Sequence, residues 1–296
     1  MATRKLFAAI IVSALACGAA LALSGCLGIW PPSLRPHKDT SFAMGTAELS
    51  DIPTSLDIDW TSGRVSVTSY DGATLQFQEV FDDREGIPQD SERMAWKVED
   101  GTLIIEFVQP GVRYWGPPKR LTVLVPSGTV FKKATIRGTS ADIDVPLLEA
   151  EKLRLYSTSG DISATLTASD LSVSTTSGDM RVVQTGSAER VSVESTSGNI
   201  FLSQQGKAAD VTAETTSGSI SIQVTECASV KADSTSGDIG IAIPADWGFN
   251  GRFSTTSGSF DYDLQLTKQG KIYTYGDGSH ALSASATSGN ISLKLK

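Results

Sequence analysis

Acidic side chains recur at one fixed place in this sequence, directly after a repeated Thr-Ser-Gly motif or its variant Thr-Ser-Ala. Regularly spaced carboxylates can bind Ca²⁺, and two carboxylates on one face can serve as the acid and base of a glycoside hydrolase. Asp161 and Asp179 are the pair that could take either role. The whole column consists of Asp142, Asp161, Asp179, Asn199, Ser219, Asp238, Ser259 and Asn290.

A structural role for this column is the interpretation that we favour, in which each Asp caps its own turn. The chain lacks the glycine-rich nonapeptide of calcium-binding β-rolls, and no column of Arg or Lys accompanies the acids. The two histidines, His37 and His280, lie far apart. We therefore predict no catalytic residue, no metal site and no cofactor. A polysaccharide-acting β-helix enzyme is kept as a remote alternative.

The motif itself recurs about every 20 residues, which is typical of stacked-repeat folds. From Ala141 to Gly258 the successive spacings are 19, 18, 20, 20, 19 and 21 residues. The motif predicts a corner at which every repeat turns, and its glycine supplies the backbone freedom needed there. The predicted turn glycines are Gly63, Gly160, Gly178, Gly198, Gly218, Gly237, Gly258 and Gly289.

Short runs of alternating apolar and polar residues flank each motif, and a period of two predicts β-strands with one buried face. In one repeat, Val193 and Ile200 are expected inside and Glu194 outside. Stacked in parallel, such strands predict an all-β fold, a β-helix or β-roll type of solenoid with rungs of about 20 residues. A column of hydroxyl side chains should face inward beside the corner: Ser157, Thr175, Ser195, Thr215, Ser234 and Thr255.

The first 25 residues differ from the rest, because two basic residues precede an apolar run and then Leu-Ser-Gly-Cys. This order is typical of a secretory signal, and its end resembles the lipobox of bacterial lipoproteins. The resemblance implies cleavage before Cys26, acylation of that residue and a membrane tether outside the cytoplasm. The apolar run is just long enough to span a bilayer, so a retained transmembrane anchor stays open, as does a freely secreted product.

Composition limits the partners and the redox chemistry. The formal net charge of −8 argues against a nucleic-acid partner, because phosphate binding needs a basic face. After signal removal and acylation of Cys26, Cys227 is the one remaining thiol, so no internal disulfide is expected. We expect Cys227 to be a small buried side chain.

The sequence divides into a signal, a proline-containing tether and one domain. Asp100-Gly101 predicts a hairpin turn, and capping of the solenoid ends is the expected role of the segments that interrupt the repeat. The predicted divisions are 1–25 for the signal peptide, 26–49 for the tether and 50–296 for the solenoid. Within the solenoid we expect an N-terminal rung with an inserted hairpin or cap at 50–120, regular repeats at 121–260, and a C-terminal cap and last rung at 261–296.

Several of the repeats carry a family resemblance. The segments LRLYSTSGDISATL, LSVSTTSGDM and VSVESTSGNI, with the closing YGDGSHALSASATSGNISLKLK, resemble the bacterial "putative adhesin" family of β-strand-repeat proteins, a domain of unknown function in cell-envelope lipoproteins. The resemblance covers residues 121–296 and, more weakly, 50–80. It implies a right-handed β-helix-like solenoid without catalytic residues.

We therefore expect a non-enzymatic cell-envelope lipoprotein that presents a β-solenoid as a binding or adhesin-like surface. Specificity would come from the end loops around residues 114–115 and 273–275. The expected partners are the membrane, through the N-terminal lipid, and an extracellular glycan or protein. An envelope structural or stress-sensing lipoprotein with a membrane partner is the alternative. An aromatic-lined groove would favour ligand binding, and a large apolar patch beside one cap would favour a protein partner.

Overall fold

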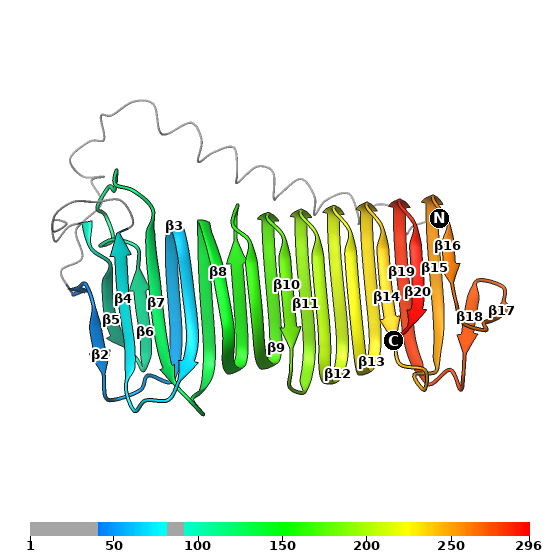
Figure 1. Cartoon of the computed structure of the whole chain (residues 1–296), viewed down its shortest axis with the longest axis horizontal. Helices are drawn as coiled ribbons and strands as arrows, with labels where there is room; N and C mark the ends of the chain where they lie inside the picture. The colour runs from blue at the N-terminus through cyan, green and yellow to red at the C-terminus, as the bar shows by residue number, and fades with distance from the viewer. Residues whose placement is uncertain (1–40, 82–91) are drawn as a thin grey trace, which may run out of the picture. The chain divides into compact units, whose positions relative to one another are not determined.

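The computed structural model describes residues 41–81 and 92–296. The predicted signal peptide, Cys26 and residues 26–40 of the predicted tether lie outside these ranges. Within the described ranges the chain is all-β, and its strands join one continuous hydrogen-bonded sheet that winds as a solenoid (Figure 1). The fold class predicted from the repeat is confirmed.

The middle of the solenoid consists of regular rungs, each made of the two strand segments on either side of one corner. Equivalent residues of successive rungs pair in parallel, so Val193 lies between Val173 and Ala213. The strands of this region are β8 (Val130–Ser157), β9 (Ile162–Ser177), β10 (Met180–Gln184), β11 (Ala188–Ser197), β12 (Ile200–Ser217), β13 (Ile220–Ser236) and β14 (Ile239–Ile243).

Burial follows the predicted alternation. Val193 and Ile200 are fully buried and Glu194 is exposed, so the predicted inward and outward assignments are confirmed. The core is a narrow column of aliphatic side chains, and each rung rests on its neighbours because one rung alone could not bury its apolar face.

The predicted inward hydroxyl column is buried at five of its six positions: Ser157, Thr175, Ser195, Thr215 and Ser234. Thr255, the sixth, is partly exposed. Some of these hydroxyls bond to the neighbouring rung at the corner. Ser234 Oγ donates to the carbonyl of Gly218 at 3.3 Å, and Thr255 Oγ1 donates to that of Gly289 at 2.9 Å.

The corner glycines lie where successive rungs approach each other closely. A Cβ added at any of the eight would overlap a backbone carbonyl oxygen of an adjacent rung, as at Gly198 with Gly178. The corner therefore excludes a side chain. φ is 98° at Gly63 and is not positive at Gly160. It lies between 144° and 156° at Gly178, Gly198, Gly218, Gly237, Gly258 and Gly289.

At the N-terminal end the order of rungs differs from the order of the chain. β3 (Ser55–Tyr70) pairs in parallel with β8 on one side. On its other side it pairs with β6 (Thr102–Glu106) and β7 (Lys119–Pro126). We expected residues 50–120 to provide one rung with an insertion. The insertion instead supplies the outermost rung, which consists of β6 and β7. After β3 the chain forms this rung on the outer side of β3, and it then forms β8 on the inner side.

Short antiparallel strands cover this outermost rung. β4 (Leu75–Phe81) pairs with β7, and β5 (Ala95–Glu99) pairs with β6 through the predicted turn at residues 100–101. β1 (Ala43–Met44) and β2 (Ala47–Leu49) extend the cover by pairing with β5 and β4. The predicted end of the tether at residue 49 is therefore wrong, because residues 43–44 and 47–49 already pair with strands of the cap.

The C-terminal end shows a second exchange of order. β19 (His280–Ser288) lies between β13 and β15 (Phe249–Ser257), and β20 (Ile291–Leu295) lies between β14 and β16 (Phe260–Tyr262). In Figure 1 the red β19 and β20 stand between the yellow β14 and the orange β15. The prediction that residues 261–296 contain the last rung is wrong, because residues 249–262 form it.

A hairpin connects these two rungs across the end of the stack. β17 (Thr267–Gln269) pairs with β18 (Ile272–Tyr275), and β18 pairs with the first three residues of β15. No strand among the described residues pairs with the outer edge of β15 beyond Gly251 or with that of β16. The C-terminal edge is thus covered only in part.

Candidate binding surfaces

The carboxylates after the turn glycines form a ladder that joins successive rungs. Asp161 Oδ1 accepts a hydrogen bond from the backbone N–H of Asp179 at 2.8 Å, and Asp179 Oδ1 accepts one from Asn199 at 2.8 Å. Asn199 Oδ1 accepts from Ser219 in turn at 2.9 Å. Each side chain therefore satisfies a backbone donor of the next rung. The expectation that each Asp caps its own turn is wrong.

The exchanged rungs at the C-terminal end continue this ladder in spatial order. Asp238 Oδ1 accepts from Asn290 N–H at 2.7 Å, and Asn290 Oδ1 accepts from Ser259 N–H at 2.9 Å. Among the described residues, no group of three or more His, Cys, Asp or Glu is arranged to hold a metal ion. The hydrogen bonds between rungs make the carboxylate ladder a structural element of the stack.

A shallow groove lies on the outer face beside this ladder, where β9, β10, β12 and β13 are neighbours. It has a volume of about 430 Å³ and is lined by Asp161, Asp179, Arg181, Phe201 and Ser221, among others. The guanidinium carbon of Arg181 lies 4.3 Å from the ring centre of Phe201, which is the paired residue of the next rung. The groove therefore combines a partly exposed aromatic ring, a cation and carboxylates.

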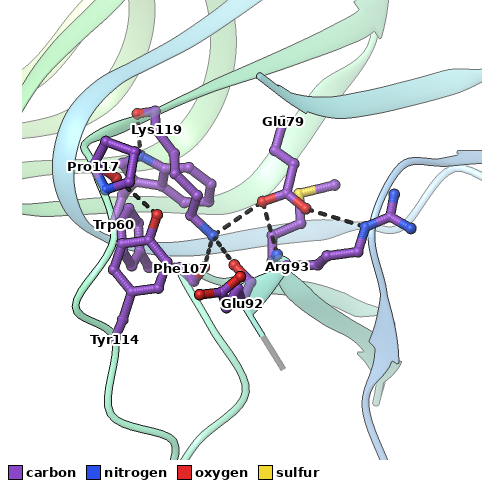
Figure 2. A network of polar contacts seen from close by, with 9 residues as sticks. Trp60, Glu79, Glu92, Arg93, Phe107, Tyr114, Pro117 and Lys119 are labelled. Atoms are coloured by element: carbon purple, nitrogen blue, oxygen red, sulfur yellow. Dashed lines mark hydrogen bonds and ion pairs between the residues drawn. The ribbon is translucent and has the colours of Figure 1, made fainter. Parts of the chain in front are cut away.

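A buried lysine lies at the N-terminal end, at the start of β7 (Figure 2). The side chain of Lys119 is 0% exposed, and its Nζ lies 3.0 Å from Oε2 of Glu79, which is 2% exposed. Nζ also donates to the carbonyls of Glu92 and Phe107. Burial lowers the pKa of Lys119 from its usual value, and the Glu79 carboxylate opposes that shift.

Aromatic rings surround this ammonium group. Trp60, Phe81, Phe107 and Tyr114 place their ring centres 4.2–5.4 Å from Nζ. Trp60 Nε1 also donates to the backbone carbonyl of Lys119 at 3.0 Å. Cation–π attraction adds to the ion pair in such a desolvated site. The cluster ties β3, β4 and β7 to residues 107–114, so its evident role is to hold the N-terminal cap together.

Tyr114 and Trp115, which we expected to contribute specificity together, have different environments. The hydroxyl of Tyr114 donates to the carbonyl of Pro117 at 2.8 Å, and its ring packs against Phe107. Trp115 is 88% exposed. Tyr114 is thus part of the lysine cluster, and Trp115 alone is presented to solvent.

An acidic group with altered ionisation lies on the outer face of the first rungs. Asp59 pairs with Glu106 on one side and with Arg137 on the other. Burial, followed by the charges of Asp59 and Asp57, raises the pKa of Glu106 to about 7, against the opposing effect of Arg137. Arg137 itself binds Asp57, with Nη2 2.6 Å from Oδ1. Glu106 therefore changes charge near neutral pH.

Aromatic side chains close the C-terminal end of the core. The rings of Phe253 and Phe260 are stacked with centres 4.1 Å apart, and Tyr273 of β18 lies edge-on to both. Tyr262 occupies an inward position of the last rung, opposite Leu293, yet it is 48% exposed. Tyr275 does not contribute a free hydroxyl, since it donates to the carbonyl of Ala245 at 2.8 Å.

Cys227 lies in the core. Burial raises the pKa of its thiol to about 12, which disfavours the reactive thiolate. The expectation of a small buried side chain is confirmed. In the part of the chain that the structure describes, no helix is both long and apolar enough to cross a membrane.

Stacked two-segment rungs, a ladder of side chains at the corner and a capped N-terminal end define a β-solenoid of the repeat type. Residues 97–294 match the family described as Toastrack DUF4097, and the protein belongs to that family. No curated protein matches the chain.

Several solved structures are similar to this chain, among them the following three. A "putative adhesin" from Bacteroides fragilis is 15% identical with a TM-score of 0.46, and the match covers 86% of this chain and 97% of that one. A "putative cell adhesion protein" from Clostridium sporogenes is 13% identical with a TM-score of 0.23, over 88% and 100% of the two chains. A "putative adhesin" from Parabacteroides merdae is 10% identical with a TM-score of 0.34, over 88% and 98%.

Proposed function

We propose that this protein is a lipid-anchored, non-enzymatic envelope protein that binds an extracellular ligand through the C-terminal end of its solenoid. The observation that carries the proposal is the difference between the two ends. Antiparallel strands cover the N-terminal rung, whereas the aromatic side chains of the last rung are partly exposed, with Tyr262 48% exposed. Partly exposed aromatic residues are enriched at binding interfaces.

The position of the anchor supports the same assignment. Acylated Cys26 would precede β1 and β2, which pair with strands of the N-terminal cap. The chain therefore enters the solenoid at the covered end, and the aromatic end is the one furthest along the stack (Figure 1).

The proposal is tested on cells that produce the full-length protein. Adherence to immobilised mucin and fibronectin would be compared between producing and non-producing cells, and then for a Tyr262→Ser, Tyr273→Ser variant. We expect adherence to depend on the protein and to fall in the variant. Equal adherence of producing and non-producing cells would refute the proposal.

A separate variant tests the anchor. Cys26→Ala should leave the protein unprocessed or release it from the membrane fraction, because the atom that carries the lipid is lost. Normal processing with unchanged membrane retention would contradict the lipoprotein assignment.

A further inference from the structure

The groove beside the carboxylate ladder contains two side chains, Arg181 and Phe201, that the stacking of the rungs does not require. Arg181 and Phe201 point outward from β10 and β12, and their removal would leave the aliphatic core intact. Arg181 makes no ion pair within the described residues, although the acids of the ladder are close to it in the sheet. Its guanidinium instead lies over the ring of Phe201.

The neighbours of this pair leave space on the face. The position equivalent to Phe201 is Ser221 in the next rung and Gly240 in the one after it. On the other side of Arg181 the equivalent residue is Ser163. A single aromatic ring therefore rises from a face of small side chains and forms one wall of the groove.

Hydrogen-bonding groups line the rest of the groove. One carboxylate oxygen of Asp161 and one of Asp179 are used in the ladder, and the second oxygen of each accepts no hydrogen bond within the described residues. These free oxygens recur at the spacing of parallel strands, about 4.8 Å. The groove thus offers acceptors from the acids, donors from Arg181, and a ring against which an apolar face can stack.

We propose that this groove binds a neutral, β-linked polysaccharide, with one sugar ring packed against Phe201. The flat pyranose of such a polymer has apolar C–H faces for stacking, and its equatorial hydroxyls can donate to Asp161 and Asp179 and accept from Arg181. Two carboxylates against one guanidinium disfavour an anionic polymer. An extended peptide is also disfavoured, because the backbone groups of these central strands already pair on both sides.

This site goes beyond the proposed function, because it lies on the flat face and not at the aromatic end. The test is retention of the detergent-solubilised full-length protein on insoluble cellulose and chitin, with cross-linked carboxymethyl cellulose as a β-linked anionic polymer. We expect retention on cellulose or chitin and none on carboxymethyl cellulose. Phe201→Ala should weaken retention about tenfold, which corresponds to about 1.4 kcal/mol. Phe201→Trp, which keeps an aromatic ring at this position, should retain wild-type binding.

Two controls separate the alternatives. Arg181→Ala, which changes an exposed side chain, should also weaken retention without lowering the melting temperature. Tyr262→Ser should retain wild-type polysaccharide binding even if it abolishes adherence, which distinguishes this site from the C-terminal end. Failure of the wild-type protein to bind both neutral polymers would overturn the proposal. So would wild-type retention of Phe201→Ala, or equally strong binding to carboxymethyl cellulose.

Discussion

Ser234 of β13 pairs with Ala286 of β19, and Thr255, one repeat after Ser234 in the sequence, lies on the far side of Ala286. The rung that closes the chain is therefore internal, and the rung before it in sequence is terminal. This exchange determines which inward-facing side chains are covered by a rung on either side, and which are covered on one side only.

Leu293 provides a direct test of this order. It is fully buried between β14 and β16, whereas Tyr262 of the last rung is 48% exposed. Leu293→Asp would place a charge inside the stack and should destabilise the protein by several kcal/mol. Tyr262→Asp should have a much smaller effect. Urea denaturation of both variants checks this. If Tyr262→Asp lowered the free energy of unfolding more than Leu293→Asp, the assignment of β20 as internal and β16 as terminal would be contradicted.

The carboxylate ladder predicts different effects for two substitutions at one position. Asp179→Ala removes the acceptor for the N–H of Asn199 and should lower the free energy of unfolding by about 1 kcal/mol. Asp179→Asn keeps an oxygen acceptor and should be nearly silent. Thermal and urea unfolding would measure both variants. Equal destabilisation would show that the charge of Asp179, and not its acceptor oxygen, is what matters.

The buried ion pair predicts a strong effect that a second substitution relieves. Lys119→Met leaves the buried Glu79 carboxylate with only the longer contact to Arg93, at 3.6 Å, as an ion pair, and should cost up to about 3–5 kcal/mol. The double variant Lys119→Met, Glu79→Gln should recover much of this loss, because no buried charge remains. A double-mutant cycle of unfolding free energies provides the measurement. A double variant as unstable as the sum of its parts would contradict the coupling.

Glu106 predicts a pH dependence with a defined sign. Its pKa rises from 4.5 to about 7 on folding, so the folded state binds the proton more tightly than the unfolded state. Between these two pH values its contribution to stability falls as pH rises. We expect the melting temperature to decrease across this window and Glu106→Gln to remove that component. A wild-type slope that persists in Glu106→Gln would assign the effect to other groups.

Glycine at the corner is required for close approach as well as for φ. Gly198, with a φ of 153°, lies against the carbonyl of Gly178, whereas Gly128, with a φ of 81°, has open space around its Cα. Gly128→Ala should therefore show only the cost of placing an L-residue at positive φ, about 1–2 kcal/mol. Gly198→Ala should cost clearly more, because adjacent rungs must separate. Comparison of the two unfolding free energies checks this, and equal losses would exclude the close-approach argument.

The interior of the solenoid could be predicted from the sequence because two periods coincide there. The repeat of about 20 residues predicts which residues pair with Val193 in the adjacent rungs. The alternation of apolar and polar residues predicts that the Val193 side chain points into the core. The order of the end rungs could not be predicted, because each rung presents the same motif to either neighbour. Nothing local in residues 280–295 distinguishes an internal from a terminal rung.

The lysine cluster was missed although a signal for it exists. Lys119 shares the parity of Leu121, Val123 and Val125, all of which are buried. Glu79 likewise shares the parity of Leu75 and Phe77. Strict alternation therefore places both charges inside, but charged residues are usually read as solvent-facing. Their mutual proximity depends on the antiparallel pairing of β4 with β7, which the sequence does not reveal.

The insertion of β19 and β20 between rungs that precede them in the chain has a consequence for biogenesis. During synthesis, residues 249–262 emerge before residues 280–295, so the last rung lacks its native parallel partner when it first appears. Stepwise addition of rungs must therefore stop at β13 and β14. The end can close only after residues 280–295 have emerged, so deletion of these residues would leave an unpaired edge on β13 and β14 and another on β15 and β16.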